Sequence, residues 1–157
     1  MRSCKHPKLL VLLVTLFGIA LDQLTKLIVD RTMALGESIP LFEGVLHITY
    51  IRNRGAAFGM LADNRWVFLT VSTVVIVVLA AFLALTKMRD PLALTALSMI
   101  LSGGIGNMID RLALGYVIDF IDFRLINFAV FNGADSFVCV GAALFLLATL
   151  LDLRRQP

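Results

Sequence analysis

The sequence predicts an all-α membrane bundle of four transmembrane helices with a small extracytoplasmic β-sheet. Hydrophobic residues make up 59% of the 157 residues and charged residues only 16%, and the mean hydropathy is +0.91. A single small soluble core cannot bury that much apolar surface. Four apolar runs have about the length of a membrane-spanning helix, roughly 17 to 25 residues, and they cover 9–28, 66–85, 92–112 and 136–151. We therefore expect residues 1–157 to form one integral membrane domain.

The distribution of Lys and Arg predicts the orientation of this bundle. These residues crowd the N-terminal tail, the short segment 87–89 and the C-terminus, whereas they are diluted over two long loops, 31–65 and 113–135. Because positive residues in short segments stay on the cytoplasmic side, both termini are expected in the cytoplasm and both long loops outside. The net charge of +3 suits anionic lipid headgroups better than nucleic acid.

The first apolar run has an alternative interpretation as a cleaved signal peptide, because basic residues precede it and small residues occur near Gly18 and Ala20. The apolar pattern continues to Ile28, which favours a retained helix. In the loop that follows, the β-branched and aromatic residues of 45–53 predict part of a small antiparallel sheet. Residues 55–61 are expected to form a short helix in the membrane interface.

Polar residues in the first and third runs mark a candidate site, because ionisable groups near a bilayer core are costly. Asp22 and Lys26 lie one helical turn apart in the order that favours an ion pair. A purely structural tie between helices and a direct role both remain open for this pair. On the third run Gly103, Asn107, Asp110 and Arg111 share one helix face.

Further carboxylates occur in the second long loop, at Asp119 and Asp122, and at the start of the fourth run, at Asp135. Helix capping is an ordinary alternative for an Asp or Asn before an apolar run. The two histidines, His6 and His47, fall on opposite sides of the predicted membrane, which argues against a zinc hydrolase and a Ser-His-Asp triad. With these chemistries excluded, the remaining candidate is a pair of carboxyl groups that share one proton, which indicates an aspartic hydrolase.

Two other classes of protein remain alternatives. A small proton-coupled transporter also carries carboxylates and broken glycine-rich helices, although its key groups should approach the bilayer midplane. A membrane scaffold without enzymatic activity would use the same polar groups only to join helices.

Five ordered sequence blocks resemble lipoprotein signal peptidase, the bacterial signal peptidase II family of membrane aspartic proteases. The blocks are DQLTK at 22–26, NRGAAFG at 53–59, GNMIDR at 106–111, VIDF at 117–120 and FNGADS at 131–136. The resemblance implies that Asp119 and Asp135 are the catalytic pair. It implies a supporting or substrate-binding shell made of Asp22, Lys26, Asn53, Gly55, Asn107, Asp110, Arg111 and Asn132. Asp122 matches no block and is interpreted as a loop residue.

The same resemblance implies the activity. A member of this family removes signal peptides from prolipoproteins at the outer face of the bacterial cytoplasmic (inner) membrane, cutting before a cysteine that carries a diacylglyceryl group. Its expected partners are prolipoprotein signal peptides, membrane lipid and inhibitors of the globomycin type, with no nucleic acid. No metal and no cofactor are expected, because a water activated by the two aspartates performs the hydrolysis.

Overall fold

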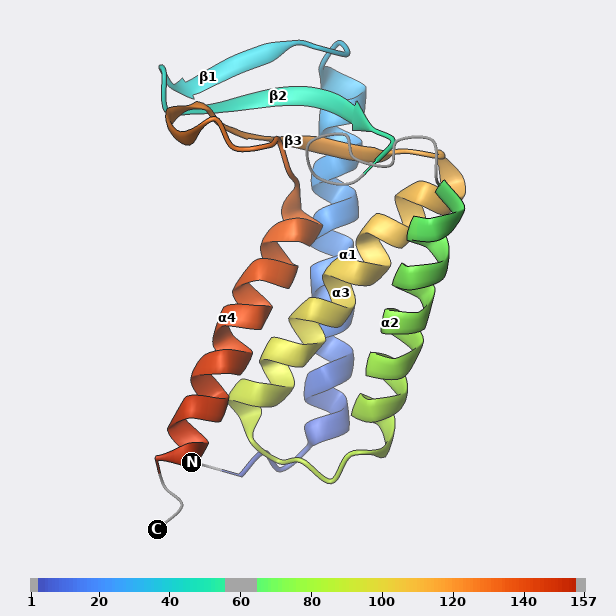
Figure 1. The fold of residues 1–157 in the computed structure, drawn as a ribbon, viewed down its shortest axis with the longest axis vertical. Helices are drawn as coiled ribbons and strands as arrows, with labels where there is room; N and C mark the ends of the chain where they lie inside the picture. The colour runs from blue at the N-terminus through green and yellow to red at the C-terminus, as the bar shows by residue number, and fades with distance from the viewer. Residues whose placement is uncertain (1–2, 56–64, 155–157) are drawn as a thin grey trace.

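The computed structural model describes residues 3–55 and 65–154, in which a helical bundle carries a sheet at the end opposite the two termini (Figure 1). The expected interfacial helix at 55–61 lies outside the described residues, apart from Gly55. The elements follow in the order α1 Pro7–Thr32, β1 Ser38–Phe42, β2 Leu46–Asn53, α2 Arg65–Leu85, α3 Pro91–Ala113, β3 Val117–Phe123, the 3-10 turn η2 Arg124–Ile126 and α4 Gly133–Leu153.

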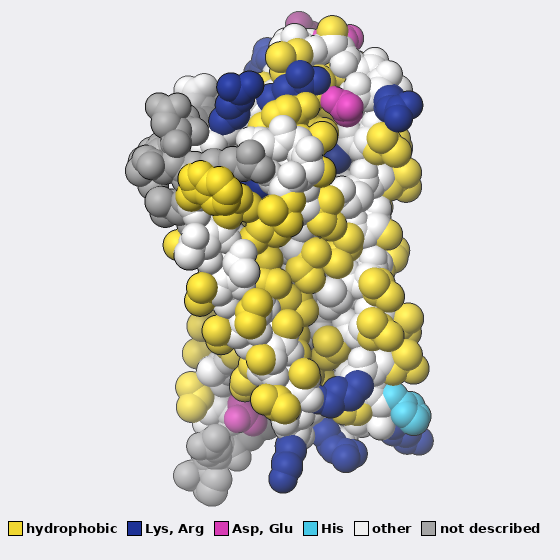
Figure 2. All heavy atoms as spheres, turned by 90° about the vertical axis from the view of Figure 1, so that its right-hand side faces the viewer, with side chains coloured by type: hydrophobic (Ala, Val, Ile, Leu, Met, Phe, Trp, Pro, Cys, Tyr) yellow, Lys and Arg dark blue, Asp and Glu magenta, His cyan; other side chains and the backbone are white. Residues whose placement is uncertain are grey.

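Three helices, α1, α3 and α4, are long and apolar enough to cross a membrane, whereas the apolar part found in α2, Leu69–Leu85, is shorter. Apolar side chains cover the middle of the bundle face in Figure 2, and Lys and Arg gather toward its two ends. This distribution is typical of a bundle surrounded by lipid. The count of four spans stays a prediction.

Helix α3 occupies the centre of the bundle and packs against α1, α2 and α4. Glycines allow the closest approaches. A Cβ on Gly103 would overlap the Ala134 carbonyl oxygen, and a Cβ on Gly141 would lie 2.7 Å from the Ala96 carbonyl oxygen. Both contacts join α3 to α4, so these glycines are required for packing in the way that small residues serve other membrane helices.

The predicted antiparallel sheet is confirmed, with the strand order β1-β2-β3. Its third strand corrects the interpretation of Asp122, which lies in β3 opposite His47 and not in a loop. The Asp122 carboxylate accepts hydrogen bonds from Thr49 Oγ1 at 2.7 Å and Arg124 Nε at 3.0 Å. Burial alone would raise the pKa of Asp122, but these two donors hold that pKa below its usual value.

The sheet is fixed to the end of α1 by a small core and a polar contact. Tyr50, Ile118 and Phe120 pack with Val29 of α1. The Tyr50 hydroxyl donates a hydrogen bond to Asp30 of α1. This attachment holds β2 and β3 over the bundle, with Asp119 paired to Ile51 across the two strands.

Candidate active site

Lys26 is the centre of a buried polar network between α1 and α3. Its Nζ atom lies 2.9 Å from Asp22 Oδ2 and 3.0 Å from Asp110 Oδ2, and it donates a hydrogen bond to Asn107 Oδ1 at 2.9 Å. The Lys26 side chain is 2% exposed and Asp22 is fully buried. A buried ammonium is tolerated only with such partners. The ion pair predicted for Asp22 and Lys26 is therefore present, and it extends to a second helix.

The two carboxylates of this network also hold the start of two other elements. Asp22 Oδ1 accepts a hydrogen bond from the backbone N–H of Ala134 in the first turn of α4, at 2.8 Å, and Asp110 Oδ2 accepts one from Ile118 N in β3 at 3.2 Å. A negative charge is favourable at a helix N-terminus. Gln23, which the sequence analysis did not single out, donates to Asp110 Oδ1 at 3.0 Å. Its place inside the first sequence block is the signal for its role.

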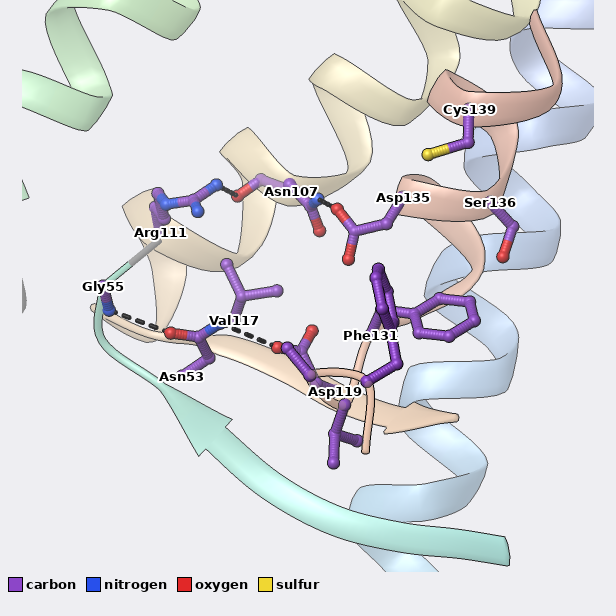
Figure 3. A pocket seen from close by; sticks show the side chains of 13 residues that line it. Asn53, Gly55, Asn107, Arg111, Val117, Asp119, Phe131, Asp135, Ser136 and Cys139 are labelled. Carbon is purple, nitrogen blue, oxygen red and sulfur yellow. Dashed lines mark hydrogen bonds between the residues drawn. The ribbon is translucent and has the colours of Figure 1, made fainter. Parts of the chain in front are cut away.

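Asp119 of β3 and Asp135 of α4 line one cavity of about 370 Å³, and Figure 3 shows their carboxyl groups facing one another across it. Asparagine amides hold both groups. Asn53 Nδ2 donates to Asp119 Oδ2 at 2.9 Å and Asn132 Nδ2 donates to Asp119 Oδ1 at 2.6 Å. Asn107 Nδ2 donates to Asp135 Oδ1 at 2.8 Å. Each aspartate therefore has a fixed orientation.

Asn132 contacts both aspartates and also caps α4. Its side-chain oxygen accepts a hydrogen bond from Asp135 N at 3.0 Å, and its backbone N–H donates to Asp135 Oδ2 at 3.2 Å, which together form a capping box. The capping alternative is thus correct for Asn132, and Asp135 completes the cap from the helix. Asn132 Nδ2 also donates to Asn107 Oδ1 at 3.0 Å, so both of its amide hydrogens have acceptors.

The electrostatic environment raises the pKa of Asp119. Burial of this side chain, which is 1% exposed, and repulsion from the Asp135 carboxylate raise the pKa of Asp119 to about 6, although the Asn53 and Asn132 amides and the Lys26 charge act in the opposite direction. A raised pKa is the property that two carboxyl groups need when they share one proton.

The cavity wall brings together some of the predicted residues and adds others. Asn53, Gly55, Asn107 and Arg111 line it with the two aspartates, whereas Asp22, Lys26 and Asp110 are not among its lining residues. Side chains that the sequence analysis did not predict complete the wall: Val117, Phe128, Ala129, Val130, Phe131, Ser136 and Cys139. Helical spacing is a signal for one of these, because Cys139 follows Asp135 by one turn.

In residues 3–55 and 65–154, no group of three or more His, Cys, Asp or Glu side chains is arranged to hold a metal ion. The expectation that neither a metal nor a cofactor is needed stays a prediction.

Residues 14–151 match the sequence profile of the family described as Signal peptidase (SPase) II. The chain belongs to the signal peptidase II family. The lipoprotein signal peptidase of Brevibacillus brevis is 46% identical over 134 residues, which cover 85% of this chain and 90% of that protein. The lipoprotein signal peptidase of Geobacter sulfurreducens is 46% identical over 150 residues, which cover 91% of this chain and 92% of that protein.

Solved structures agree with this membership. A bacterial membrane enzyme determined by the in meso method at 2.3 Å resolution has a TM-score of 0.88 and 31% identity, with 99% of this chain and 95% of that chain covered. A second bacterial membrane enzyme, determined by the same method at 1.9 Å resolution, has a TM-score of 0.82 and 32% identity, with 95% of this chain and 96% of that chain covered.

The chain is accordingly a bacterial membrane protein and a signal peptidase II, an aspartic protease that removes signal peptides from prolipoproteins. Family membership sets aside the transporter and scaffold alternatives. The cavity between Asp119 and Asp135 is the candidate active site of this signal peptidase II.

Proposed function

We propose that Asp119 and Asp135 are the catalytic pair of this peptidase and that it cuts prolipoproteins before a diacylglyceryl-modified cysteine. The observation that carries the proposal is the cavity of about 370 Å³ in which two aspartates from separate elements face one another. They are the carboxylates among the described residues that line this cavity. Two facing carboxyl groups are the arrangement with which aspartic proteases activate water.

In the proposed mechanism a water molecule lies between the two carboxyl groups, which share one proton. The ionised aspartate takes a proton from the water, whose oxygen attacks the scissile carbonyl carbon, while the protonated aspartate donates to the carbonyl oxygen. The tetrahedral intermediate then collapses, and the leaving amine takes a proton from the pair. Arg111 lines the cavity and supplies N–H donors for the developing oxyanion, and the loss of one such donor typically costs about 2.7 to 4 kcal/mol.

The remaining predicted residues have supporting roles in this proposal. Asn53, Asn107 and Asn132 orient the two carboxyl groups through their amide N–H groups. The backbone N–H of Gly55 donates to Asn53 Oδ1 at 2.9 Å, which directs the amide nitrogen of Asn53 toward Asp119.

Lys26 links this asparagine shell to the rest of the bundle. Its bond to Asn107 Oδ1 fixes the amide that holds Asp135 and connects it to the ion pairs of Lys26 with Asp22 and Asp110. These three charged residues therefore support the dyad from behind the cavity and do not touch the substrate.

The proposed placement puts both termini in the cytoplasm and the sheet at the outer face of the inner membrane, with residues 1–157 acting as one peptidase domain. The apolar segment of a signal peptide then lies along the bundle in lipid. The acyl chains of the modified cysteine remain in the bilayer and present the preceding bond to the cavity, an anchoring contribution of about 0.8 kcal/mol per buried methylene. Inhibitors of the globomycin type occupy the same cavity.

Purified chain in detergent, supplied with a diacylglyceryl-modified precursor, tests the proposal by gel shift. Asp119→Asn and Asp135→Asn should each abolish cleavage, because the water needs both carboxyl groups, whereas Asp122→Asn serves as the matched control and should remain active. A precursor with serine in place of the modified cysteine should stay intact, and globomycin should block the reaction. Near-normal turnover by either Asp119→Asn or Asp135→Asn would refute the catalytic assignment. Equal cleavage of both precursors would show that the enzyme does not recognise the lipid.

A further inference from the structure

Near the β1–β2 turn, the register gives the sheet one apolar and one polar face, because directly paired residues in antiparallel strands point to the same side. On one face lie two cross-strand rows: Ile39, Ile48 and Ile121, and then Phe42, Leu46 and Phe123. On the other face lie the paired residues Ser38 and Thr49, and His47 and Asp122.

The apolar face looks toward the cavity and the start of α4. Asp119, Ile121 and Phe123 alternate along β3 and therefore share a face, and Asp119 lines the cavity at the helix end of the sheet. Phe123 also stacks on Phe131, directly before α4, with ring centroids 6.0 Å apart. The opposite face meets the end of α1 through Ile118 and Phe120, which pack with Val29, and farther along that face Thr49 and Asp122 are hydrogen bonded to each other.

The free ends of the strands extend past the top of α4 in Figure 1, where no helix of residues 3–55 and 65–154 is drawn against this part of the apolar face. Side chains there are exposed: Phe42 by 67%, Leu125 by 70% and Ile126 by 68%. The 3-10 turn lies beside the β1–β2 hairpin, because the backbone N–H of Arg124 donates to the Val45 carbonyl oxygen at 3.0 Å. We call this surface the sheet-tip patch, made of Ile39, Phe42, Phe123, Leu125, Ile126 and Phe128.

We propose that the sheet-tip patch is embedded in the acyl region of the bilayer leaflet nearest the sheet. The patch is continuous with the face that looks toward the cavity and the start of α4, and lipid is the medium that surrounds the apolar helices. Apolar and aromatic side chains beside a polar face are the pattern of elements that lie in the membrane interface. Arg124, with a side chain that is 44% exposed and bonded to Ser38 and Asp122, lies on the polar side at headgroup level.

The patch is continuous with the active site. Phe128 is 51% exposed as part of the patch and also lines the cavity of Asp119 and Asp135. It packs edge-on against Phe131 with ring centroids 5.7 Å apart. The embedded patch therefore sets the depth of the cavity at the boundary between headgroups and acyl chains. This inference goes beyond the catalytic proposal, since it holds whether or not the dyad assignment is correct.

Tryptophan fluorescence in reconstituted vesicles tests the proposal. The chain has one tryptophan, so Trp66→Phe provides a dark background for Phe42→Trp and Ile126→Trp in the patch. Pro40→Trp is the matched control, because Pro40 is exposed and pairs with His47 on the polar face of the same strand as Phe42. Each variant is placed in vesicles whose lipids carry bromine either near the headgroup end or near the methyl end of the acyl chains. Acrylamide is the quencher in the aqueous phase.

Emission from Phe42→Trp and Ile126→Trp should be largely lost with bromine near the headgroup end, while Pro40→Trp should be quenched by acrylamide instead. Acrylamide quenching of both patch tryptophans, without an effect of the brominated lipids, would overturn the proposal in favour of a patch in water. Protection from both quenchers would overturn it in favour of a second copy or another protein on the patch. Thermal unfolding in detergent checks that each variant is folded, and two patch positions on separate segments keep the test decisive if one variant is not.

Discussion

Replacing Asn132 by serine would separate the two tasks of this side chain. A serine hydroxyl still caps a helix well, so it can accept the hydrogen bond from Asp135 N that Asn132 Oδ1 accepts at 3.0 Å. It has no amide nitrogen with which to reach Asp119 Oδ1 and Asn107 Oδ1, which Asn132 Nδ2 contacts at 2.6 and 3.0 Å. The variant therefore keeps the start of α4 and loses the orientation of Asp119.

The expected magnitude follows from the bond that is lost. A hydrogen bond to a charged group contributes about 1.5 to 3 kcal/mol. If this bond is needed in the transition state, its loss lowers kcat/KM roughly 10- to 150-fold. Asn132 is fully buried, so water does not replace the missing donor. Asn132→Asp, which keeps the size and the cap but places an oxygen against Asp119, should lower kcat/KM further.

The assay is single-turnover cleavage of a diacylglyceryl-modified precursor, with thermal unfolding of each variant in detergent measured in parallel. Asn127→Gly is the control, because Asn127 is an exposed asparagine of the same loop with a φ of 47°, which glycine adopts easily. Its kcat/KM should match that of the unsubstituted chain. Unchanged kcat/KM for Asn132→Ser, with a loss of thermal stability alone, would show that Asn132 only caps α4 and would refute the orienting role.

Two further predictions concern buried charge. Lys26→Met should lower the free energy of unfolding by about 3 to 5 kcal/mol, because it leaves Asp22 and Asp110 without their ammonium partner. Adding Asp22→Asn should restore part of the lost stability. Additive losses of the two substitutions in unfolding measurements would contradict the coupling. Asp119 has a native pKa of about 6 against an ordinary value of 3.8, so the folded state binds a proton at this carboxyl more tightly than the unfolded state. The stabilisation from this proton is complete below about pH 4 and is lost as the pH rises through 6, and it amounts to about 3 kcal/mol. The free energy of unfolding of Asp119→Asn, relative to that of the unsubstituted chain, should therefore increase between pH 4 and pH 7. One broken amide contact lowers the stability of the variant by the same amount at every pH. A difference in stability that does not change with pH would contradict the raised pKa.

The sequence predicted the residues of the site better than the way in which they are connected. Asp22 and Lys26 formed the expected pair because helical spacing alone brings them together. Asp119 and Asp135 reached one cavity as the ordered blocks implied. The double contact of Asn132 was not predicted, because it depends on where β3 passes over α4, and no local spacing contains that information.

Strand β3 was missed for a physical reason. A half-buried strand is recognised by alternation of apolar and polar residues, but here each face of β3 is mixed. Asp119 shares its face with Ile121, and Asp122 shares the other face with Phe120. Asp119 meets the cavity and Asp122 meets the polar cluster of Thr49, so each face has an apolar part and a polar part, and the period of two is lost.

The position of the Lys26 network also bears on how the protein enters the membrane during synthesis. Helix α1 is translated first, and its two buried charges, Asp22 and Lys26, neutralise one another within the helix at 2.9 Å. This matters because one charged residue at the centre of an inserting helix costs about 2.5 to 3.5 kcal/mol. Asp110 arrives later on α3, when Lys26 is already in place to receive it at 3.0 Å. The order of the helices along the chain is thus also an order of assembly, in which Lys26 is inserted before Asp110, the acidic residue of α3 that pairs with it.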